Sequence, residues 1–173
     1  MLAPTAPRKF LLFSLLAGSF LIVLAVLFYQ SLAGKQAAPD VTYVNLKGEK
    51  ISSQSLRGKV VMVNFWATSC STCVAEMPQM IETYNKFHPK GLEFVAVAMS
   101  YDPPNYVLNY AETRQLPFHV ALDVQGQLAQ SFGDVKLTPT TYVIDKQGKI
   151  IKRYVGQPSF KELHALLEQA LAV

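Results

Sequence analysis

The chain has 173 residues, of which half are hydrophobic, and a formal net charge of +4 from 16 basic and 12 acidic residues. Three of the basic residues, Arg8, Lys9 and Lys35, precede the first acidic residue, Asp40, so the rest of the chain is almost neutral. This composition argues against a nucleic acid or another polyanion as the partner.

The first predicted element is an uncharged apolar run from Phe10 to Tyr29. About 20 apolar residues span a bilayer as a helix, and this run lacks the polar stripe that marks a helix on the core of a globular domain. Arg8 and Lys9 precede the run, and positively charged flanks stay in the cytoplasm. We therefore predict a single transmembrane helix with the rest of the chain outside.

The predicted plan is a cytoplasmic tail over residues 1–9, a transmembrane anchor over 10–29, a linker over 30–39 and one globular domain over 40–173. A cleaved signal peptide is the alternative, because Ser31-Leu32-Ala33 has the small-x-small pattern of a cleavage site.

Strands and helices alternate along the domain. A continuous apolar run over 59–67 predicts a central strand that is covered on both faces. A helix is expected to follow it, because apolar residues recur at spacings of three and four through Met77, Met80, Ile81, Tyr84 and Phe87. The further elements expected are a strand over 92–100, a helix over 105–114, a strand over 118–123, a short helix over 126–132, a hairpin over 140–156 and a last helix that begins at a Ser159–Glu162 capping box.

The only two cysteines, Cys70 and Cys73, lie three residues apart in the run WATSCSTC. A disulfide between them closes so short a loop that it removes little entropy from the unfolded chain. We therefore predict that the pair reacts rather than braces the fold.

Metal or haem binding is the rival role for the cysteines. Zinc needs four ligands, and the three histidines, at 88, 119 and 164, lie far apart in the sequence without ligand spacing. A c-type haem requires a histidine directly after the second cysteine, where this chain has Val74. No metal is expected.

The runs VVMVNFWATSCSTCVAEMP and LTPTTYVID make residues 40–173 resemble the membrane-anchored TlpA/ResA-like thiol-disulfide oxidoreductases of the thioredoxin superfamily. The resemblance implies an α/β thioredoxin-like fold, a central mixed β-sheet flanked by helices, preceded here by the transmembrane helix. It also implies a single span in the bacterial inner membrane, with the catalytic domain in the periplasm and no dissociable cofactor. Relatives take electrons from a membrane thiol-electron transporter and reduce apocytochrome c or other oxidised extracytoplasmic proteins.

Each cysteine receives a role in this chemistry. If Cys70 begins the helix, free N–H groups and the helix dipole stabilise its thiolate, and such thiols have pKa values of about 3.5 to 7.5. Cys70 is therefore the expected nucleophile. Cys73, on the first turn, is the expected resolving thiol of the redox-active disulfide.

The resemblance implies roles for four further residues. Pro139 is expected to be cis and to lie beside the cysteines, although only about 5–6% of X-Pro bonds in folded proteins are cis. The main chain of Thr138 is expected to pair with a substrate, and Trp66 to shield the thiols. Glu76 is expected to manage protons, because Asn64 stands where cytoplasmic thioredoxins carry a titratable aspartate.

Three alternatives stay open or weak at this point. Ser71-Thr72 between the cysteines leaves the redox poise undecided, so a disulfide oxidant on the same scaffold is an alternative to the reductant. A copper-handling thioredoxin-like binding protein is another, and it would recruit a histidine. A peroxidase is a poor fit, because Ala67 lies three residues before Cys70 and no proline is nearby.

Overall fold

The computed structural model describes residue 24 and residues 36–172. The predicted tail, the anchor except for residue 24, the cleavage site and the linker before Gln36 lie outside these residues. Within the part of the chain that the structure describes, none of the helices has both the length and the apolar composition of a bilayer-spanning segment.

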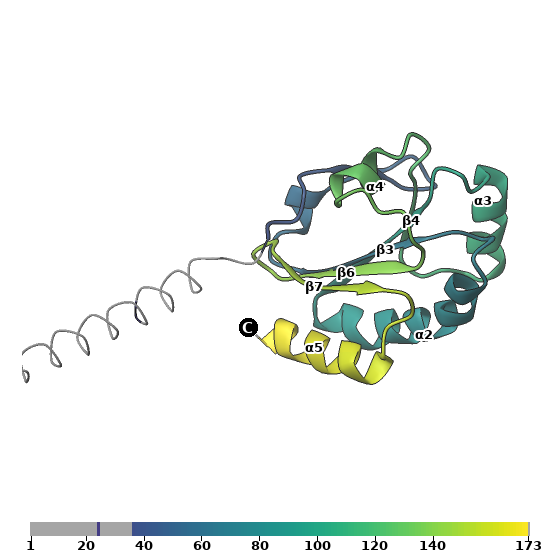
Figure 1. The fold of residues 1–173 in the computed structure, drawn as a ribbon. Helices are drawn as coiled ribbons and strands as arrows, with labels where there is room; N and C mark the ends of the chain where they lie inside the picture. The colour runs from purple at the N-terminus through teal and green to yellow at the C-terminus, as the bar shows by residue number, and fades with distance from the viewer. Residues whose placement is uncertain (1–23, 25–35, 173) are drawn as a thin grey trace, which may run out of the picture. The chain divides into compact units, whose positions relative to one another are not determined.

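A five-stranded mixed sheet forms the centre of the domain (Figure 1). Its order is β5-β4-β3-β6-β7, in which β3, β4 and β5 are parallel and β6 is antiparallel to both of its neighbours. The bounds are Val60–Trp66 for β3, Leu92–Ala98 for β4, His119–Leu122 for β5, Thr140–Ile144 for β6 and Ile150–Val155 for β7.

Strand β3 is the middle strand of the sheet, and all seven of its residues are buried. Its side chains alternate between two cores: Val60, Met62 and Trp66 face one, and Val61, Val63 and Phe65 face the other. A strand that is covered on both faces needs a continuous apolar sequence, which explains why the run over 59–67 predicted it.

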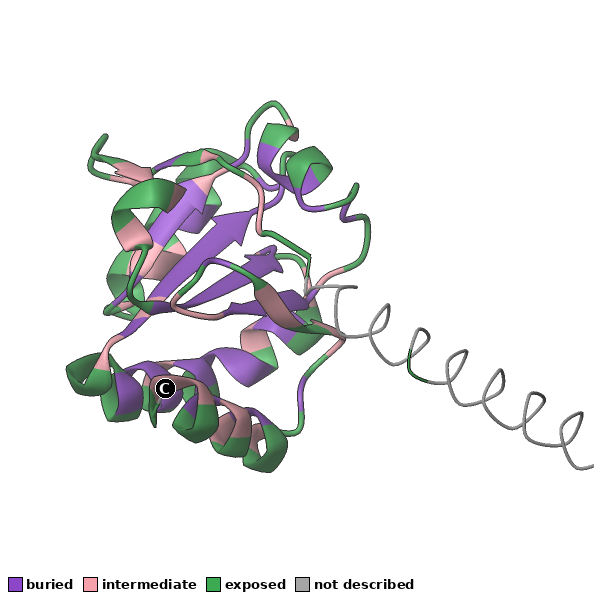
Figure 2. Cartoon of the chain, turned by 90° about the vertical axis from the view of Figure 1, so that its left-hand side faces the viewer, coloured by how far each residue is buried: buried purple, intermediate pink, exposed green. Residues whose placement is uncertain are grey.

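Helices cover one face of the sheet and a mixture of short elements covers the other (Figures 1 and 2). Helices α2 (Ser71–Phe87), α3 (Pro104–Thr113) and α5 (Phe160–Ala172) contribute to the core on the first face. Helix α4 (Gln127–Ser131), the strand β1 (Thr42–Val44) and the segments that follow it contribute to the second. The sheet is therefore the middle layer of three.

The α/β thioredoxin-like arrangement confirms the predicted fold class for the domain. The expected strands and helices are all present, but sequence reasoning missed the two-stranded sheet of β1 and β2 (Lys50–Ser52) and the 3-10 helices η1 (Ser53–Leu56) and η2 (His88–Lys90). Strands of three residues are too short to show alternation, and β1 and β2 are held by pairing with each other.

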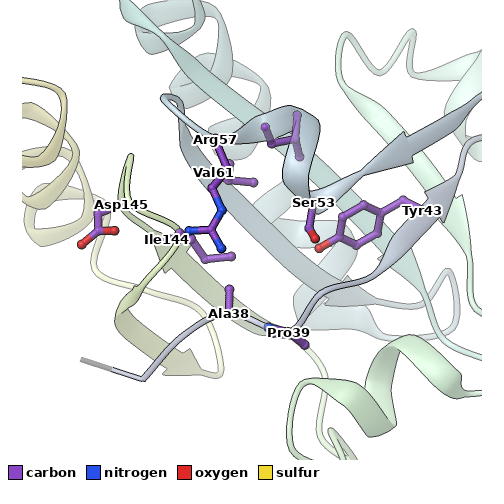
Figure 3. A pocket seen from close by; sticks show the side chains of 10 residues that line it. Ala38, Pro39, Tyr43, Ser53, Arg57, Val61, Ile144 and Asp145 are labelled. Carbon is purple, nitrogen blue, oxygen red and sulfur yellow. The ribbon is translucent and has the colours of Figure 1, made fainter. Parts of the chain in front are cut away.

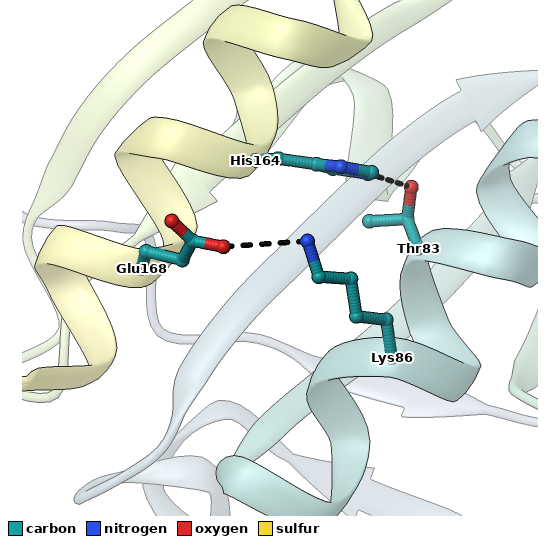
Figure 4. Close-up of polar contacts among 4 residues, drawn as sticks. All are labelled: Thr83, Lys86, His164 and Glu168. Carbon is teal, nitrogen blue, oxygen red and sulfur yellow. Dashed lines mark hydrogen bonds and ion pairs between the residues drawn. The ribbon is translucent and has the colours of Figure 1, made fainter.

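Helices α2 and α5 are joined by polar contacts at their packed faces (Figure 4). Nε2 of His164 lies 2.8 Å from Oγ1 of Thr83, and Nζ of Lys86 lies 3.3 Å from a carboxylate oxygen of Glu168. The Thr83 hydroxyl donates its only hydrogen to the carbonyl of Gln79, so the His164 ring is the donor in the first contact. This histidine has a structural role.

The first described residues lie at the edge of the large sheet. Ala37 forms an antiparallel bridge with Lys149, supported by hydrogen bonds from Ala38 N–H to the Gly148 carbonyl and from Ile150 N–H to the Gln36 carbonyl. Because Lys149 precedes β7, this pairing lies at the end of the sheet where β3 begins.

Candidate active site

The loops that carry the predicted site residues meet at one end of the sheet. Strand β3 leads into the loop over 67–69 and then into Cys70, while β6 runs in the opposite direction and begins directly after Pro139. Phe65 pairs with Thr140, so the register puts Pro139 beside the end of β3. The fold thus brings together segments that are about 70 residues apart in the sequence.

Cys70 is the N-cap residue of α2, in an extended conformation, and its sulfur accepts a hydrogen bond from the Cys73 N–H at 3.2 Å. The two cysteines form a disulfide, with their Cα atoms 5.2 Å apart. Cys70 is only partly buried, whereas Cys73 is fully buried beneath the first turn. An attacking reagent therefore meets the sulfur of Cys70 first.

The Thr138-Pro139 peptide bond is cis, which confirms the geometry that the resemblance implied. Pro139 is buried, and its carbonyl accepts a hydrogen bond from Gly156 N–H at 2.8 Å. The main-chain N–H and carbonyl of Thr138 make no hydrogen bond to any residue of the described part of the chain. They are available to an incoming strand.

Glu76 is 1% exposed, and its two carboxyl oxygens differ. Oε1 accepts a hydrogen bond from Nδ2 of Asn64 at 3.2 Å, whereas Oε2 is buried without a partner among the described residues. Burial raises the pKa of Glu76 to about 7, against the lowering effect of the Asn64 hydrogen bond. When the carboxyl is neutral, its proton therefore belongs on Oε2.

Asn64 connects Glu76 to the proline-bearing strand. Its Nδ2 also donates to Oγ1 of Thr141 at 2.9 Å, so both hydrogens of the amide are used. Sequence reasoning linked Asn64 and Glu76 through the resemblance but missed Thr141. In the sequence, Asn64 and Thr141 can be recognised as polar side chains within strands that are largely apolar. Because both strands are fully buried, such side chains need hydrogen-bond partners inside the fold.

Trp66 is fully buried in the same core cluster as Cys73. Its ring centroid lies 5.2 Å from that of Tyr110, and its indole N–H has no partner among the described residues. The side chain therefore belongs to the core that also contains Cys73.

Asp102 and Thr68 were also missed. The carboxyl of Asp102 accepts hydrogen bonds from the N–H of Thr68 at 2.6 Å and from its hydroxyl at 2.5 Å. The two residues are 34 positions apart. Asp102 stands directly before Pro103-Pro104, and an aspartate at this position indicates the N-terminus of a helix. Nothing local in the sequence indicates the pairing.

The hollows among the described residues include one beside the first turns of α2, lined by residues that include Val74, Met77 and Tyr110. Another, between η1 and the turn after β6, is lined by residues that include Tyr43, Ser53, Arg57 and Asp145 (Figure 3). Its volume of about 20 Å³ admits about one water molecule. Within the described residues, no three His, Cys, Asp or Glu side chains are grouped to hold a metal ion.

Known proteins share this arrangement. The sequence profile of the Redoxin family matches residues 32–167. The thiol-disulfide oxidoreductase ResA of Bacillus thuringiensis subsp. konkukian is 36% identical over 136 residues, which cover 79% of this chain and 77% of ResA. ResA of Bacillus subtilis is 32% identical over 135 residues, which cover 78% and 74%. A crystal structure of a thioredoxin-family thiol:disulfide interchange protein from Chlorobium tepidum matches with a TM-score of 0.73 at 30% identity, over 80% of this chain and 97% of that one.

Proposed function

Because the chain belongs to the Redoxin family and is a thiol-disulfide oxidoreductase of the ResA type, we propose that it is a membrane-anchored reductant of protein disulfides in the periplasm. Its substrates in this proposal are apocytochrome c or other oxidised extracytoplasmic proteins. A membrane thiol-electron transporter restores the dithiol. The observation that carries the proposal is the asymmetry of the pair: Cys70 is partly exposed at the start of α2, and Cys73 is buried behind it.

This asymmetry assigns the order of bond changes. In the reduced protein the Cys70 thiolate attacks a substrate disulfide, a mixed disulfide forms, and one substrate sulfur leaves as a thiolate. Cys73 then loses its proton and attacks the Cys70 sulfur, which releases the second substrate sulfur and forms the Cys70–Cys73 disulfide. Two electrons pass from the protein to the substrate.

Glu76 is the proposed acceptor of the proton that Cys73 loses. It follows Cys73 by three residues, so the two side chains share one face of α2. A pKa near 7 lets the carboxyl take up and release a proton around neutral pH. The unpartnered Oε2 is the oxygen that receives it.

Thr138 and Pro139 form the proposed docking position for the substrate chain. The unpaired main chain of Thr138 offers one donor and one acceptor to an extended segment beside the disulfide. Trp66 is the proposed shield of the thiols, because it is fully buried, lies four residues before Cys70 and belongs to the same core as Cys73.

The proposed location rests on the sequence before the domain. The uncharged run over 10–29 has the length of a membrane span, and Arg8 with Lys9 favours a cytoplasmic N-terminus. This orientation puts the cysteines on the periplasmic side.

The reduction potential tests the direction of the reaction. Full-length protein in detergent is equilibrated with glutathione buffers, and the reduced fraction is measured by thiol labelling. We expect a potential nearer to the thioredoxin end, about −270 mV, than to the strong oxidants near −120 mV. A value close to the second figure supports the oxidant instead.

A further inference from the structure

Asp102 anchors the loop that precedes Cys70. Its side chain is 4% exposed, and each of its carboxyl oxygens accepts one hydrogen bond from Thr68, at 2.6 and 2.5 Å. Thr68 stands two residues before Cys70. One buried side chain on another strand's loop therefore fixes both the main chain and the side chain of the loop that carries the reactive cysteine.

Helix α3 does not account for Asp102. An aspartate at the start of a helix usually accepts hydrogen bonds from the free N–H groups of the first turn. The N-cap of α3 is Pro103, and no side chain caps this helix. The carboxyl is committed to Thr68 instead.

The segment that contains Asp102 also contacts the loop on the other side of the cysteines. Met99 N–H donates to the carbonyl of Trp66 at 3.0 Å, and the hydroxyl of Tyr101 lies 3.3 Å from Oγ1 of Thr138. Residues 99–102 thus contact three places around the cysteines. Met99 bonds to the end of β3, Asp102 to the cysteine loop, and Tyr101 to the loop that contains Thr138.

We propose that Asp102 is a positioning residue for disulfide exchange: through Thr68 it holds Cys70 at a fixed place relative to the docking main chain of Thr138. A protein disulfide must meet Cys70 and Thr138 at the same time. A small disulfide needs Cys70 alone. Displacing a reacting group by about 1 Å can cost about 100-fold in rate, so loosening the loop penalises the protein substrate selectively. The inference rests on thiol-disulfide exchange and on the proposed docking role of Thr138, and not on the proposed direction or location.

The chain contains a matched control for Asp102. Asp123 is also 4% exposed, also follows a parallel strand, and also uses both carboxyl oxygens as acceptors, from Leu128 N–H at 3.0 Å and Ala129 N–H at 2.8 Å. Its partners belong to α4, and it makes no hydrogen bond to the cysteine loop. Asp102→Ala and Asp123→Ala therefore each remove two hydrogen bonds, at two different places.

The experiment compares two rate constants for each full-length variant in detergent. Reduced protein is mixed with insulin, as a protein disulfide, and with hydroxyethyl disulfide, as a small one, and the ratio of the two rate constants is taken. We expect Asp102→Ala to lower this ratio about tenfold or more and Asp123→Ala to change it less than about twofold. If the wild-type protein runs the reaction only in reverse, oxidised protein with reduced ribonuclease and with a small thiol gives the corresponding ratio.

Thr68 supplies a second pair of variants in case Asp102→Ala does not fold. Thr68→Val removes the hydroxyl donor and should lower the ratio, whereas Thr68→Ser keeps both donors and should preserve it. An unchanged ratio in Asp102→Ala and in Thr68→Val, or an equal fall in Asp123→Ala, overturns the proposal. Wild-type protein that exchanges with neither substrate in either direction contradicts the activity, and is recognised before any variant is compared.

Discussion

Glu76 resists ionisation because its carboxyl group is buried, with a hydrogen bond to one oxygen and no partner for the other among the described residues. The Asn64 amide stabilises the charged form, but the loss of water around the group outweighs that single hydrogen bond. An acid whose pKa is raised in the folded state prefers to be neutral there. As the pH rises from about 4.5 to about 7, Glu76 ionises in the unfolded chain before it ionises in the folded protein. The free energy of unfolding therefore falls over this range.

The change Glu76→Gln tests this linkage. Between the ordinary pKa of about 4.5 and the folded value of about 7, the wild-type free energy of unfolding should fall relative to the variant by up to about 3 kcal/mol, and the difference should then level off. Urea denaturation of the oxidised protein from pH 4.5 to 8 measures it. Glu82→Gln, on the exposed side of the same helix, is the control. Parallel curves for wild type and Glu76→Gln would show that Glu76 is not desolvated.

The same variant addresses the proposed proton transfer. If Glu76 exchanges protons with the thiols, Glu76→Gln should shift the pH dependence of Cys70 alkylation in the reduced protein, because a titrating charge has been removed near the pair. Iodoacetamide labelling followed by mass spectrometry gives the profile. A profile identical to that of the wild type would remove Glu76 from the mechanism.

The two cysteines should behave differently when each is removed. In Cys73→Ala, Cys70 can still attack a partner, but no second thiol releases the mixed disulfide, so covalent adducts should accumulate. Cys70→Ala should form few adducts, because Cys73 is fully buried. Non-reducing gels of the membrane fraction detect the adducts, and a thiol reductant should dissolve them. Adducts on Cys70→Ala alone would reverse the assignment.

At the scale of elements, the α2–α5 interface carries its own pH dependence. Burial lowers the pKa of His164, and the positive charge of Lys86 lowers it further. The unfolded chain therefore binds the proton first as the pH falls, and the fold loses stability below about pH 6.5.

His164→Gln keeps an N–H donor for the Thr83 hydroxyl but has no group that titrates in this range. We expect the variant to lose less stability than the wild type between about pH 6.5 and 5. Thermal denaturation at a series of pH values measures the slope. Equal slopes for the two proteins would contradict a desolvated histidine.

A helix or strand could be predicted from the sequence where the pattern that indicates it lies within that one segment. The seven buried residues of β3 and the three-and-four spacing in α2 are visible without any partner. The pairing of Thr68 with Asp102, and of Asn64 with Thr141, depends on loops and strands that meet only in the fold. The cis bond before Pro139 was predicted from the resemblance against its base rate, because no local pattern distinguishes it.

At the scale of the whole molecule, the proposed anchor makes a direct prediction. Full-length protein should remain in the membrane fraction after an alkaline carbonate wash, because residues 10–29 form an uncharged and largely apolar segment that is long enough to span the lipid as a helix. Protease added to spheroplasts should then digest the domain. Recovery of a shortened protein from the soluble periplasmic fraction, starting near residue 34, would identify a cleaved signal peptide instead.

The pairing of Ala37 with Lys149 determines which end of the domain remains accessible when the chain is tethered. The chain joins the sheet where β3 begins, and Cys70 follows the end of β3. Seven strand residues at about 3.3 Å each separate these ends by roughly 20 Å. A resin or a fluorescent protein joined directly at Gln36 is therefore attached at the end of the sheet opposite the thiols. Immobilisation through Gln36 should for this reason preserve the rate of disulfide exchange, whereas the same attachment through Ser69 should abolish it.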